Sequence, residues 1–336
     1  MKIAIHKSKD IYSERWIKYC EDNNIDYKIV NAYDTDIIQQ VSDCDAFMWH
    51  HSHINYKDTL FAKQLLYSLE ISGKKVFPNW RTGWHFDDKL GQKYLLEAIG
   101  EPLVPSYVFF TQKEALEWIE NTSFPKVFKL RRGSGASNVK LVTNKKEAIR
   151  LVNKAFGCGF SQWDSINNLK ERWRKYKHNQ TNIKEIFKGI IRIFYKTEFE
   201  KMHSYEKGYV YFQDFIDNNQ FDIRVIVIGH RAIGEKRICR EGDFRASGSG
   251  NFEYIQIRED VLRIAFDTVY KLGLQSAAFD FIFENNKPLI IELSYAFGTT
   301  GISHCKGYYT SDLQWHPEIE PNFYGWMVEE VINNTI

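Results

Sequence analysis

The sequence predicts a protein of mixed class, α/β and α+β, with an N-terminal parallel α/β domain followed by a larger fold of two subdomains. Three observations predict this. Strand-like and helix-like segments alternate through residues 1–80, which is typical of a parallel sheet with crossover helices. The chain after residue 208 is mainly β in character. A length of 336 residues is enough for two or three subdomains. We therefore expect an N-terminal domain at 1–80, a first subdomain at 81–215 and a second at 216–336.

Charge and cysteine content exclude several classes of protein. Lysine and arginine number 45 against 43 acidic residues, so nucleic acid is not an expected partner, although residues 170–207 are locally basic. The five cysteines are scattered singly, with no metal-binding pair and no disulfide framework. The start MKIAIHKSKD lacks a signal-peptide apolar region, and no later stretch is long enough to span a bilayer. We expect a soluble, cytoplasmic protein.

The N-terminal domain is expected to have four strands, at residues 2–5, 27–30, 46–49 and 74–77, with helices between them. Its third strand leads into a histidine-rich corner formed by His50, His51, Ser52 and His53. Ligands bind at the carboxyl ends of parallel strands, so these histidines are candidate substrate contacts. A solvated loop that happens to contain histidines explains the pattern equally well. A metal site is less favoured, because no carboxylate lies at ligand spacing.

The middle of the chain combines helices with one unusual hairpin. Helices are expected at residues 87–100, after Thr111 with Glu114 in capping-box spacing, and at 144–156. The stretch FPKVFKLRRGSGASNVKLV has strand-like flanks around seven turn residues, 131–137, whereas a simple hairpin needs two or three. An insertion at about 157–208 is predicted to form two basic amphipathic helices, either a packed accessory element or an arm that binds a partner.

The segment AAFDFIFENNKPLIIELS carries the clearest chemical signal. Period-two alternation, with a turn at residues 285–287, places Asp280 directly opposite Glu292, with Ser294 on the same face. Like charges facing each other destabilise a sheet, so a cation is expected beside them. Carboxylate oxygens suit Mg²⁺, although a solvent-facing strand with lysine or arginine neighbours is the alternative. The opposite, apolar face is expected to hold Phe279, Phe281, Phe283, Leu289, Ile291 and Leu293.

The glycine-containing turn of the earlier hairpin is a candidate phosphate contact. Backbone N–H groups approach phosphate oxygens closely where glycine removes the Cβ. The turn joins two strands and lacks the GxxxxGK pattern before a helix, so it is not a Walker-type P-loop. Lys129, in the strand entering the turn, is placed to bring a positive charge to a phosphate. A flexible hairpin tip is the alternative.

Four motifs in one order resemble the ATP-grasp superfamily, in particular ligases of the ribosomal-protein glutamate ligase (RimK) type. They are FPKVFKLRRGSGAS, YFQDFIDNNQFDIRVIVIG, REGDFRASGSGN, and FDF with IIELS. The resemblance covers about residues 79–298. It implies two α+β subdomains that close on ATP, preceded by an N-terminal α/β domain, with ATP and Mg²⁺ or Mn²⁺ as cofactors.

The resemblance also implies roles for individual residues. Residues 132–137 would cover the β- and γ-phosphates, 213–216 would form the adenine hinge, and Asp222 would bind the ribose. Asp280 and Glu292 would be the Mg²⁺ ligands. The full set implied to bind the nucleotide is Lys89, Lys129, Arg132, Gly133, Ser134, Gly135, Ala136, Ser137, Gln213, Asp214, Phe215, Ile216, Asp222 and Lys236.

One position departs from the family pattern. The metal strand of the family usually ends in Glu-x-Asn, whereas Ser294 stands at the Asn position here. A hydroxyl is still a neutral oxygen ligand, so the resemblance implies a metal site with altered coordination.

Three arginines are candidate catalytic groups: Arg224, Arg237 and Arg245. They lie on the strands and the loop that the family uses over the reacting phosphate. Positive groups arranged around developing phosphoryl charge are the main catalytic device of such chemistry. Each arginine taken alone could be a surface residue, but the run REGDFR favours a functional role for Arg245.

The resemblance implies an ATP-dependent carboxylate-amine ligase that forms an acyl phosphate and then an amide. No side-chain nucleophile motif is present, which agrees with this chemistry. A small-molecule kinase and a nucleotide-binding scaffold without catalysis are the alternatives. The expected substrates are a small carboxylate and an amine: a sugar acid of surface-polysaccharide biosynthesis, an amino acid or a peptide. Assembly into a homo-oligomer stays open.

Overall fold

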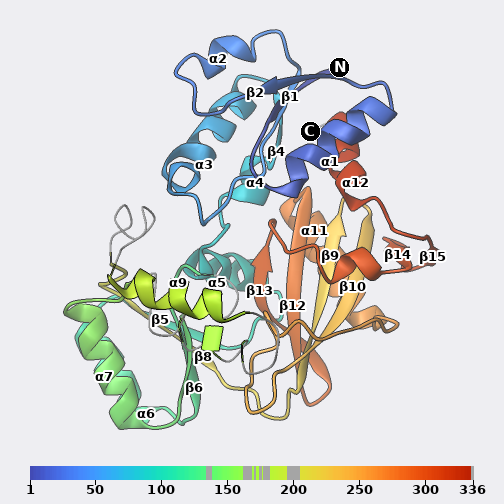
Figure 1. The fold of residues 1–336 in the computed structure, drawn as a ribbon. Helices are drawn as coiled ribbons and strands as arrows, with labels where there is room; N and C mark the ends of the chain where they lie inside the picture. Colours follow the sequence, from blue (N-terminus) through green and yellow to red (C-terminus); the bar gives the residue numbers. More distant parts are fainter. Residues whose placement is uncertain are drawn as a thin grey trace. The chain divides into compact units, whose positions relative to one another are not determined.

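The computed structural model describes residues 1–133, 138–161, 169, 172–173, 176, 182–194 and 205–333. The chain divides into two compact units. Figure 1 labels their helices and strands. Unit 1 comprises residues 1–53, 57–104 and 216–336, and unit 2 comprises 54–56 and 105–215. Residues 81–104 therefore group with unit 1 and not with the first predicted subdomain. The physical reason is that the Gln92 side chain accepts a hydrogen bond from Leu293 N at 3.3 Å, while Thr82 Oγ1 accepts one from Gln275 N at 2.8 Å.

The first sheet of unit 1 is parallel, in the order β2-β1-β3-β4, as the strand and helix alternation predicts. Alternate residues of β1 face opposite sides of this sheet: Ile3 and Ile5 pack in one buried cluster, and Ala4 packs in another. The sheet is therefore buried on both faces. Its elements are β1 (Lys2–His6), α1 (Ile11–Asp22), β2 (Asp26–Val30), α2 (Ile37–Gln40), β3 (Ala46–Met48), α3 (Tyr56–Ile71), β4 (Lys75–Phe77) and α4 (Trp80–Gly83).

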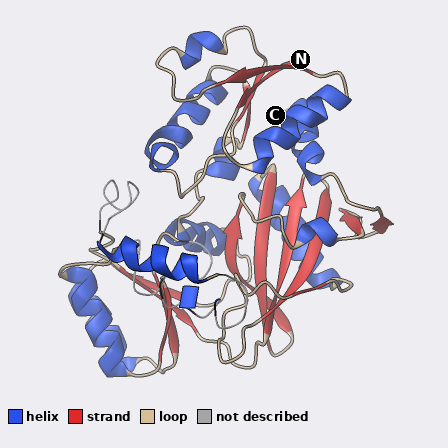
Figure 2. Ribbon diagram, in the orientation of Figure 1, coloured by secondary structure: helices blue, strands red, loops and turns tan. Residues whose placement is uncertain are grey.

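The second sheet of unit 1 has long strands, plain in Figure 2, in the order β13-β12-β9-β10-β14-β15, with β11 pairing β10. Helix α11 packs on one face of it against β9 and β12. The other elements complete this part of the chain. They are α5 (Lys89–Ala98), β9 (Phe221–Ile228), β10 (Arg231–Ile238), β11 (Phe252–Glu253), α11 (Glu259–Leu272), β12 (Ser276–Glu284), β13 (Lys287–Ser294), η1 (Ile302–His304), β14 (Gly307–Thr310), β15 (Trp315–Pro317) and α12 (Phe323–Asn333).

The hairpin of β12 and β13 pairs Asp280 with Glu292, as predicted, but by a different route. The turn contains two residues, Asn285 and Asn286, both at positive φ, and not three. A bulge after Asp280 restores the predicted pairing by adding one residue to β13. The expectation for the apolar face of β13 is therefore wrong in part. The buried residues of β13 are Pro288, Ile290 and Leu293, whereas Leu289 and Ile291 are only half-buried.

Unit 2 contains an antiparallel sheet in the order β5-β8-β6-β7, with its apolar side chains packed against α6 and α7. The predicted capping box begins α6: Thr111 Oγ1 accepts from Glu114 N at 3.3 Å and donates to the Glu114 carboxylate at 2.6 Å. Of the two predicted basic helices, the second is present as α9, and the first lies largely outside the described residues. The elements are β5 (Ser106–Phe109), α6 (Gln112–Asn121), β6 (Lys126–Lys129), β7 (Val139–Val142), α7 (Lys145–Phe156), α9 (Ile183–Phe194) and β8 (Val210–Asp214).

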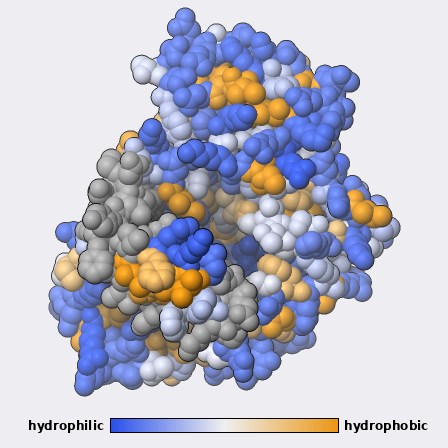
Figure 3. Space-filling model, viewed as in Figure 1, coloured by the Kyte–Doolittle hydropathy of each residue, from blue (hydrophilic) through white to orange (hydrophobic). Residues whose placement is uncertain are grey.

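The face shown in Figure 3 is mostly hydrophilic, with separate hydrophobic patches. One patch lies on α9, where Ile183, Phe187 and Ile190 are exposed at helical spacing. Across the described ranges, no helix combines the length and the apolar character that crossing a membrane requires.

Candidate active site

A row of charged side chains crosses the second sheet of unit 1 on the face opposite α11. Strand register places Glu292 beside Asp280, Asp280 beside Arg224, and Arg224 beside Glu235. Residues directly opposite one another in paired strands project to the same face, so these four side chains form one line across β13, β12, β9 and β10. We call this line, together with Arg237 two residues after Glu235 on β10, the charged row.

Asp280 lies at the centre of the charged row and is held by two arginines. Arg224 is bidentate, with Nε 2.7 Å from Oδ1 and Nη2 2.9 Å from Oδ2. Arg237 Nη2 lies 2.7 Å from Oδ2, and the Asp280 side chain is only 4% exposed. Burial acts to raise the pKa of Asp280, but Arg224 and Arg237 outweigh it and hold the pKa well below its usual range. Asp280 is therefore ionised and fixed in position.

Glu292 is held by a lysine of α5. Lys89, the first residue of that helix, places Nζ 3.2 Å from Glu292 Oε1 and is itself buried. Ser294, two residues further along β13, donates its hydroxyl hydrogen to Ala296 O at 2.7 Å, which leaves the oxygen lone pairs available. The cation that the facing carboxylates require is thus supplied by the chain itself.

Asp222 lies one step along the same face, where it forms a buried pair with Arg237. Nε and Nη2 of Arg237 are each 2.6 Å from a carboxylate oxygen of Asp222. Burial raises the pKa of Asp222 to about 6, against the opposing effect of Arg237. Both oxygens of Asp222 are therefore engaged, and its side chain is 5% exposed. The ribose contact expected of Asp222 stays a prediction.

Glu235 closes the charged row on β10 and was not among the residues predicted from the sequence. It is almost completely buried, and within the described part of the chain its Oε2 has no hydrogen-bond partner. Burial raises the pKa of Glu235 to about 7, although Arg224 and Arg237 act to lower it. A Cβ at Gly301 would lie 1.9 Å from this oxygen, so the neighbouring glycine leaves the carboxyl its space.

The donor set of the charged row fits Mg²⁺ in chemistry. Asp280, Glu292 and Ser294 offer hard oxygen ligands on adjacent strands. Among the residues that the structure describes, no three histidine, cysteine or acidic side chains converge as a metal site. A Mg²⁺ ion here would therefore need oxygens from substrate phosphates and water in addition, which is the usual arrangement for this ion.

Unit 2 brings a second set of predicted residues together on β6 and β8. Lys129 Nζ donates to Gln213 Oε1 at 2.6 Å, and Gln213 Nε2 donates to Ser106 Oγ at 3.0 Å. Asp214 accepts from Lys126 Nζ. The two strands are hydrogen-bonded neighbours, which explains why residues more than 80 positions apart meet here.

The remaining predicted residues of unit 2 are partly described. Arg132 is half-buried, 4.0 Å from Glu206, and Gly133 has a φ of +118°, a conformation that favours glycine. Phe215 and Ile216 follow β8 and are half-buried. Ser134, Gly135, Ala136 and Ser137 lie outside the described residues.

Lys236 and Arg245 do not join the charged row. Lys236 alternates with Glu235 and Arg237 along β10, so it faces the other side, where Nζ lies 2.7 Å from Glu253 Oε2. Arg245 lies in the loop after β10 and binds Asp243, with Nη2 2.6 Å from Oδ2. The nucleotide role of Lys236 and the catalytic role of Arg245 remain predictions.

The histidine-rich corner lies where the parallel-sheet argument expects it, after β3. His50 Nδ1 is 2.8 Å from Asp10 Oδ2, and His51 is buried with its carbonyl oxygen accepting from the Tyr295 hydroxyl at 2.7 Å. His53 packs against Phe86, with ring centroids 5.6 Å apart. The solvated-loop interpretation does not fit His51, because a solvated residue would be exposed.

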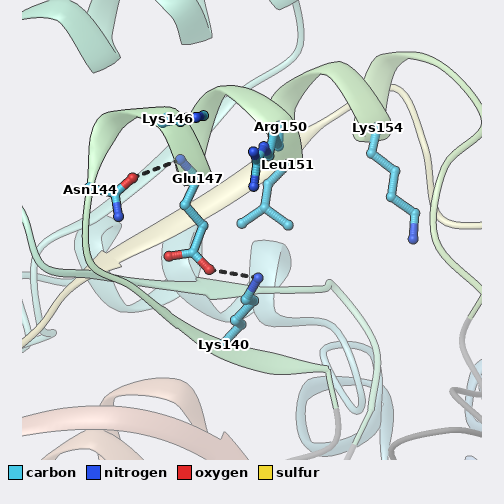
Figure 4. Close-up of a pocket in the computed structure, with 7 residues that line it drawn as sticks. All are labelled: Lys140, Asn144, Lys146, Glu147, Arg150, Leu151 and Lys154. Carbon is cyan, nitrogen blue, oxygen red and sulfur yellow. Dashed lines mark hydrogen bonds and ion pairs between the residues drawn. The ribbon is translucent and has the colours of Figure 1, made fainter.

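A basic groove of about 470 Å³ occupies a different part of unit 2 (Figure 4). Glu147 bridges to Lys140 at 2.7 Å inside it. None of the residues predicted to bind nucleotide lines this groove. Its lining residues are Lys140, Asn144, Lys146, Glu147, Arg150, Leu151 and Lys154.

Comparison with known proteins identifies the fold and the domain. Residues 184–311 match the model of the RimK-like ATP-grasp domain. This stretch of the chain is thus similar to a RimK-like ATP-grasp domain. The match includes β8, β9, β10, β12 and β13, and therefore the whole charged row. It does not include the first sheet or the hairpin of β6 and β7.

Relatives and solved structures agree with this assignment. Over 107 residues, the chain is 34% identical to a probable alpha-L-glutamate ligase 1 of Shewanella sp. (strain MR-4), covering 30% of this chain and 35% of that protein. A probable alpha-L-glutamate ligase 1 of Shewanella baltica is 35% identical over 107 residues, with the same coverage. The chain thus spans about a third of the length of these relatives.

The ATP-grasp fold extends over the whole chain. A RimK domain protein of Sphaerobacter thermophilus superposes with a TM-score of 0.60 at 13% identity, covering 99% of this chain and 100% of that one. D-alanine–D-alanine ligase of Bacillus anthracis, complexed with ATP, superposes with a TM-score of 0.57 at 13% identity, covering 99% and 96%. At such identities these structures establish the fold alone, so the activity must be argued from the site.

Proposed function

We propose that this protein is an ATP-dependent carboxylate-amine ligase that releases ADP and forms an amide through an acyl phosphate. The charged row carries the proposal. Two carboxylates suited to Mg²⁺ stand beside three cations, Lys89, Arg224 and Arg237, that are suited to phosphate oxygens. The RimK-like domain contains all but one of these residues, Lys89 being the exception.

The substrate class follows from the same relatives. Proteins named alpha-L-glutamate ligases match 30% of the chain, which supports an amino acid as one substrate and an amino acid or a peptide as the other. A cytoplasmic location and a sugar acid as substrate remain further proposals without support from these relatives.

The residues of the charged row have separate roles in this proposal. Asp280 and Glu292, with Ser294 Oγ, would hold Mg²⁺, which supplies positive charge to the phosphate oxygens. Arg224 and Arg237 stabilise the charge that develops while a substrate carboxylate oxygen attacks the γ-phosphorus and ADP leaves. The amine nitrogen then attacks the acyl carbon, and phosphate leaves with the bonding electrons.

Unit 2 contributes its own contacts to the nucleotide. We assign Lys129, Arg132 and Gly133 to the phosphates, with Ser134, Gly135, Ala136 and Ser137 continuing the loop. Gln213, Asp214, Phe215 and Ile216 are assigned to the adenine, because the end of β8 presents polar and half-buried apolar groups together.

The ion pairs predict an order of binding. In the structure, Asp280 and Glu292 are already neutralised by Arg224, Arg237 and Lys89. Mg²⁺ alone must compete with these fixed cations. Nucleotide phosphates offer Lys89 a new anionic partner and can accept hydrogen bonds from the N–H groups of Arg224 that do not face Asp280. We therefore expect Mg²⁺ to raise the melting temperature clearly only when ATP or ADP is present, by mass action on the folded state. Equal stabilisation by Mg²⁺ without nucleotide would contradict this order.

The decisive experiment measures ADP release with ATP, Mg²⁺ and pairs of amino acids, together with trapping of the acyl phosphate by hydroxylamine. Glu292→Gln removes one charge from the row and is expected to lower both signals by about 10²-fold or more. Glu284→Gln is the matched control, because Glu284 is an exposed carboxylate at the end of the same hairpin. ATP binding with no ADP release for any pair, or an equal loss in both variants, would refute the ligase proposal.

A further inference from the structure

A histidine-aspartate pair lies at the carboxyl end of the first sheet. Asp10 is the N-cap of α1, where its carboxylate accepts from Tyr12 N at 3.0 Å and from Ser8 Oγ at 2.7 Å. Its other oxygen lies 2.8 Å from His50 Nδ1. The Tyr12 ring stacks on the imidazole, with centroids 3.7 Å apart and an interplanar angle of 8°. Together these contacts fix the His50 ring from its edge and its face.

The pairing decides which nitrogen of His50 carries hydrogen. Burial acts to raise the pKa of Asp10, but the contacts from His50 and Ser8 keep it below the ordinary value, so the carboxylate is ionised and only accepts. Nδ1 is therefore the donor, and Nε2 keeps its lone pair when the ring is neutral. Nε2 is buried and has no hydrogen-bond partner within the described residues.

Other histidines of the chain show what sets His50 apart. His6, at the end of β1, uses Nδ1 to accept from Ala32 N at 3.0 Å, which is a structural contact. His51 and His85 also have unmatched buried nitrogens, but the described residues place no carboxylate in hydrogen-bond contact with either ring. Leaving a buried polar atom unmatched costs free energy, and among these rings only His50 is at the same time held in one tautomer by an anion.

The pair lies close to the charged row, within the same compact unit. Tyr295 follows Ser294 directly, and its ring centroid is 5.8 Å from that of His50. The neighbouring His53 interacts electrostatically with Lys89 and Glu292. The end of β13 therefore connects the carboxylates of the row to the Asp10–His50 pair.

We propose that His50 is the base that takes a proton from the attacking amine, and that Asp10 is the residue that positions it. The inference rests on the proposed ligase function. Most amines are protonated at neutral pH and have no lone pair for attack. His50 Nε2 accepts one proton from the ammonium group, and the freed lone pair forms the C–N bond with the acyl carbon. The bond from that carbon to the phosphate oxygen breaks, and phosphate leaves with the electron pair and the second amine proton. The amide keeps the third.

The charges around His50 suit this step. Asp10 at the N-cap of α1 and Asp58 on α3 are the acidic groups that interact with the ring, and both favour the imidazolium that forms. Two further histidines, His51 and His53, oppose it, but burial lowers the pKa of each, so they are neutral. The phenols of Tyr12 and Tyr295 contribute no charge, because burial raises the pKa of each well above its ordinary value.

The test separates the amine step from the phosphoryl step. His50→Asn keeps an amide N–H near the Nδ1 position for Asp10 but removes the titrating nitrogen. We expect amide formation with an amino acid acceptor to fall about 10²-fold or more at neutral pH. Trapping by hydroxylamine should stay within about twofold of wild type, because hydroxylamine is largely unprotonated and needs no base. Raising the pH should restore amide formation as the acceptor amine loses its own proton.

Two further variants complete the design. Asp10→Asn preserves the helix cap, since Asn caps as well as Asp. It is expected to lower kcat for amide formation, because it no longer fixes the His50 ring, while the KM for the acceptor amine and the hydroxamate signal stay near wild type. His230→Gln, on the exposed turn between β9 and β10, is the control. Equal losses of amide and hydroxamate in His50→Asn, or no loss of either, would overturn the role of His50. Absence of hydroxamate from the wild type would instead refute the ligase function itself, and this role with it.

Discussion

The charged row of unit 1 and the lysine contacts of unit 2 hold positive groups in different ways. In the charged row, Arg224 and Arg237 are fixed by two-point contacts to buried carboxylates. In unit 2, Lys129 donates to the neutral amide of Gln213, and Lys126 donates to a partly exposed Asp214. Planar guanidinium groups match carboxylates bidentately, whereas an ammonium group is a point charge on a flexible stem.

The difference separates two tasks that nucleotide chemistry demands. Groups that stabilise a transition state must be in place before the reaction, and the bidentate pairs of the charged row supply that rigidity. Groups that admit and release a nucleotide must change partners at low cost, and a lysine on a neutral amide does so more easily than a buried ion pair. The same contrast predicts where substitutions will unfold the protein and where they will only weaken it.

The largest expected effect is on the buried pair of Asp222 and Arg237. Asp222→Asn keeps the shape of the side chain but leaves Arg237 with half of its compensating charge. Breaking a buried ion pair costs about 3–5 kcal/mol, because one charge stays desolvated without its partner. We expect a loss of about 3 kcal/mol in the free energy of unfolding, measured by urea denaturation. Asp217→Asn, an exposed aspartate before β9, is the control, and equal denaturation midpoints for the two variants would contradict the assignment.

Local sequence patterns predicted part of the charged row and missed the rest. The pairing of Asp280 with Glu292 was accessible, because alternation and turn length act within one hairpin. Its partner Arg224 was named only through the family resemblance, because it lies 56 residues before Asp280, on a strand whose register against β12 no local pattern reveals. Glu235 was missed for the same reason, although the alternation of Glu235 and Arg237 in GEKRI was a usable signal. The histidine-rich corner was recognised, but Asp10 was not, since two different strands bring them together.

The second prediction concerns Glu235. It tests whether the Glu235 carboxyl group is ionised like the other acidic groups of the charged row. Its pKa of about 7 in the folded protein exceeds the ordinary carboxyl value of 4.5, so between these values the folded state holds a proton that the unfolded chain has released. The stabilisation of the folded protein by this proton is therefore fully present below pH 4.5 and is lost as the pH rises to 7. Glu235→Gln should remove this loss, on the order of 1–3 kcal/mol, from the pH dependence of unfolding.

The comparison for Glu235 is made at two pH values in urea. The free energy of unfolding of the wild type, relative to that of Glu235→Gln, should be higher at pH 5 than at pH 7. A difference that does not change with pH would mean that the Glu235 carboxyl ionises normally, and the charged row would then carry one more negative charge.

The smallest expected effect is on Asp214 in unit 2. Asp214 pairs with Lys126, as Asp222 pairs with Arg237 in unit 1. Asp214→Asn keeps an acceptor oxygen for Lys126, whose ammonium also lies over the rings of Tyr107 and Trp118, at 5.3 and 5.9 Å from their centroids. The Asp214 side chain is 26% exposed, so water replaces part of what is lost. We expect a loss of about 1 kcal/mol or less in the free energy of unfolding, because Asn keeps a hydrogen-bond acceptor and water reaches part of the site. A loss equal to that of Asp222→Asn would show that the lysine contacts of unit 2 are as fixed as the arginine pairs of unit 1, and the division between rigid and exchangeable cations would fail.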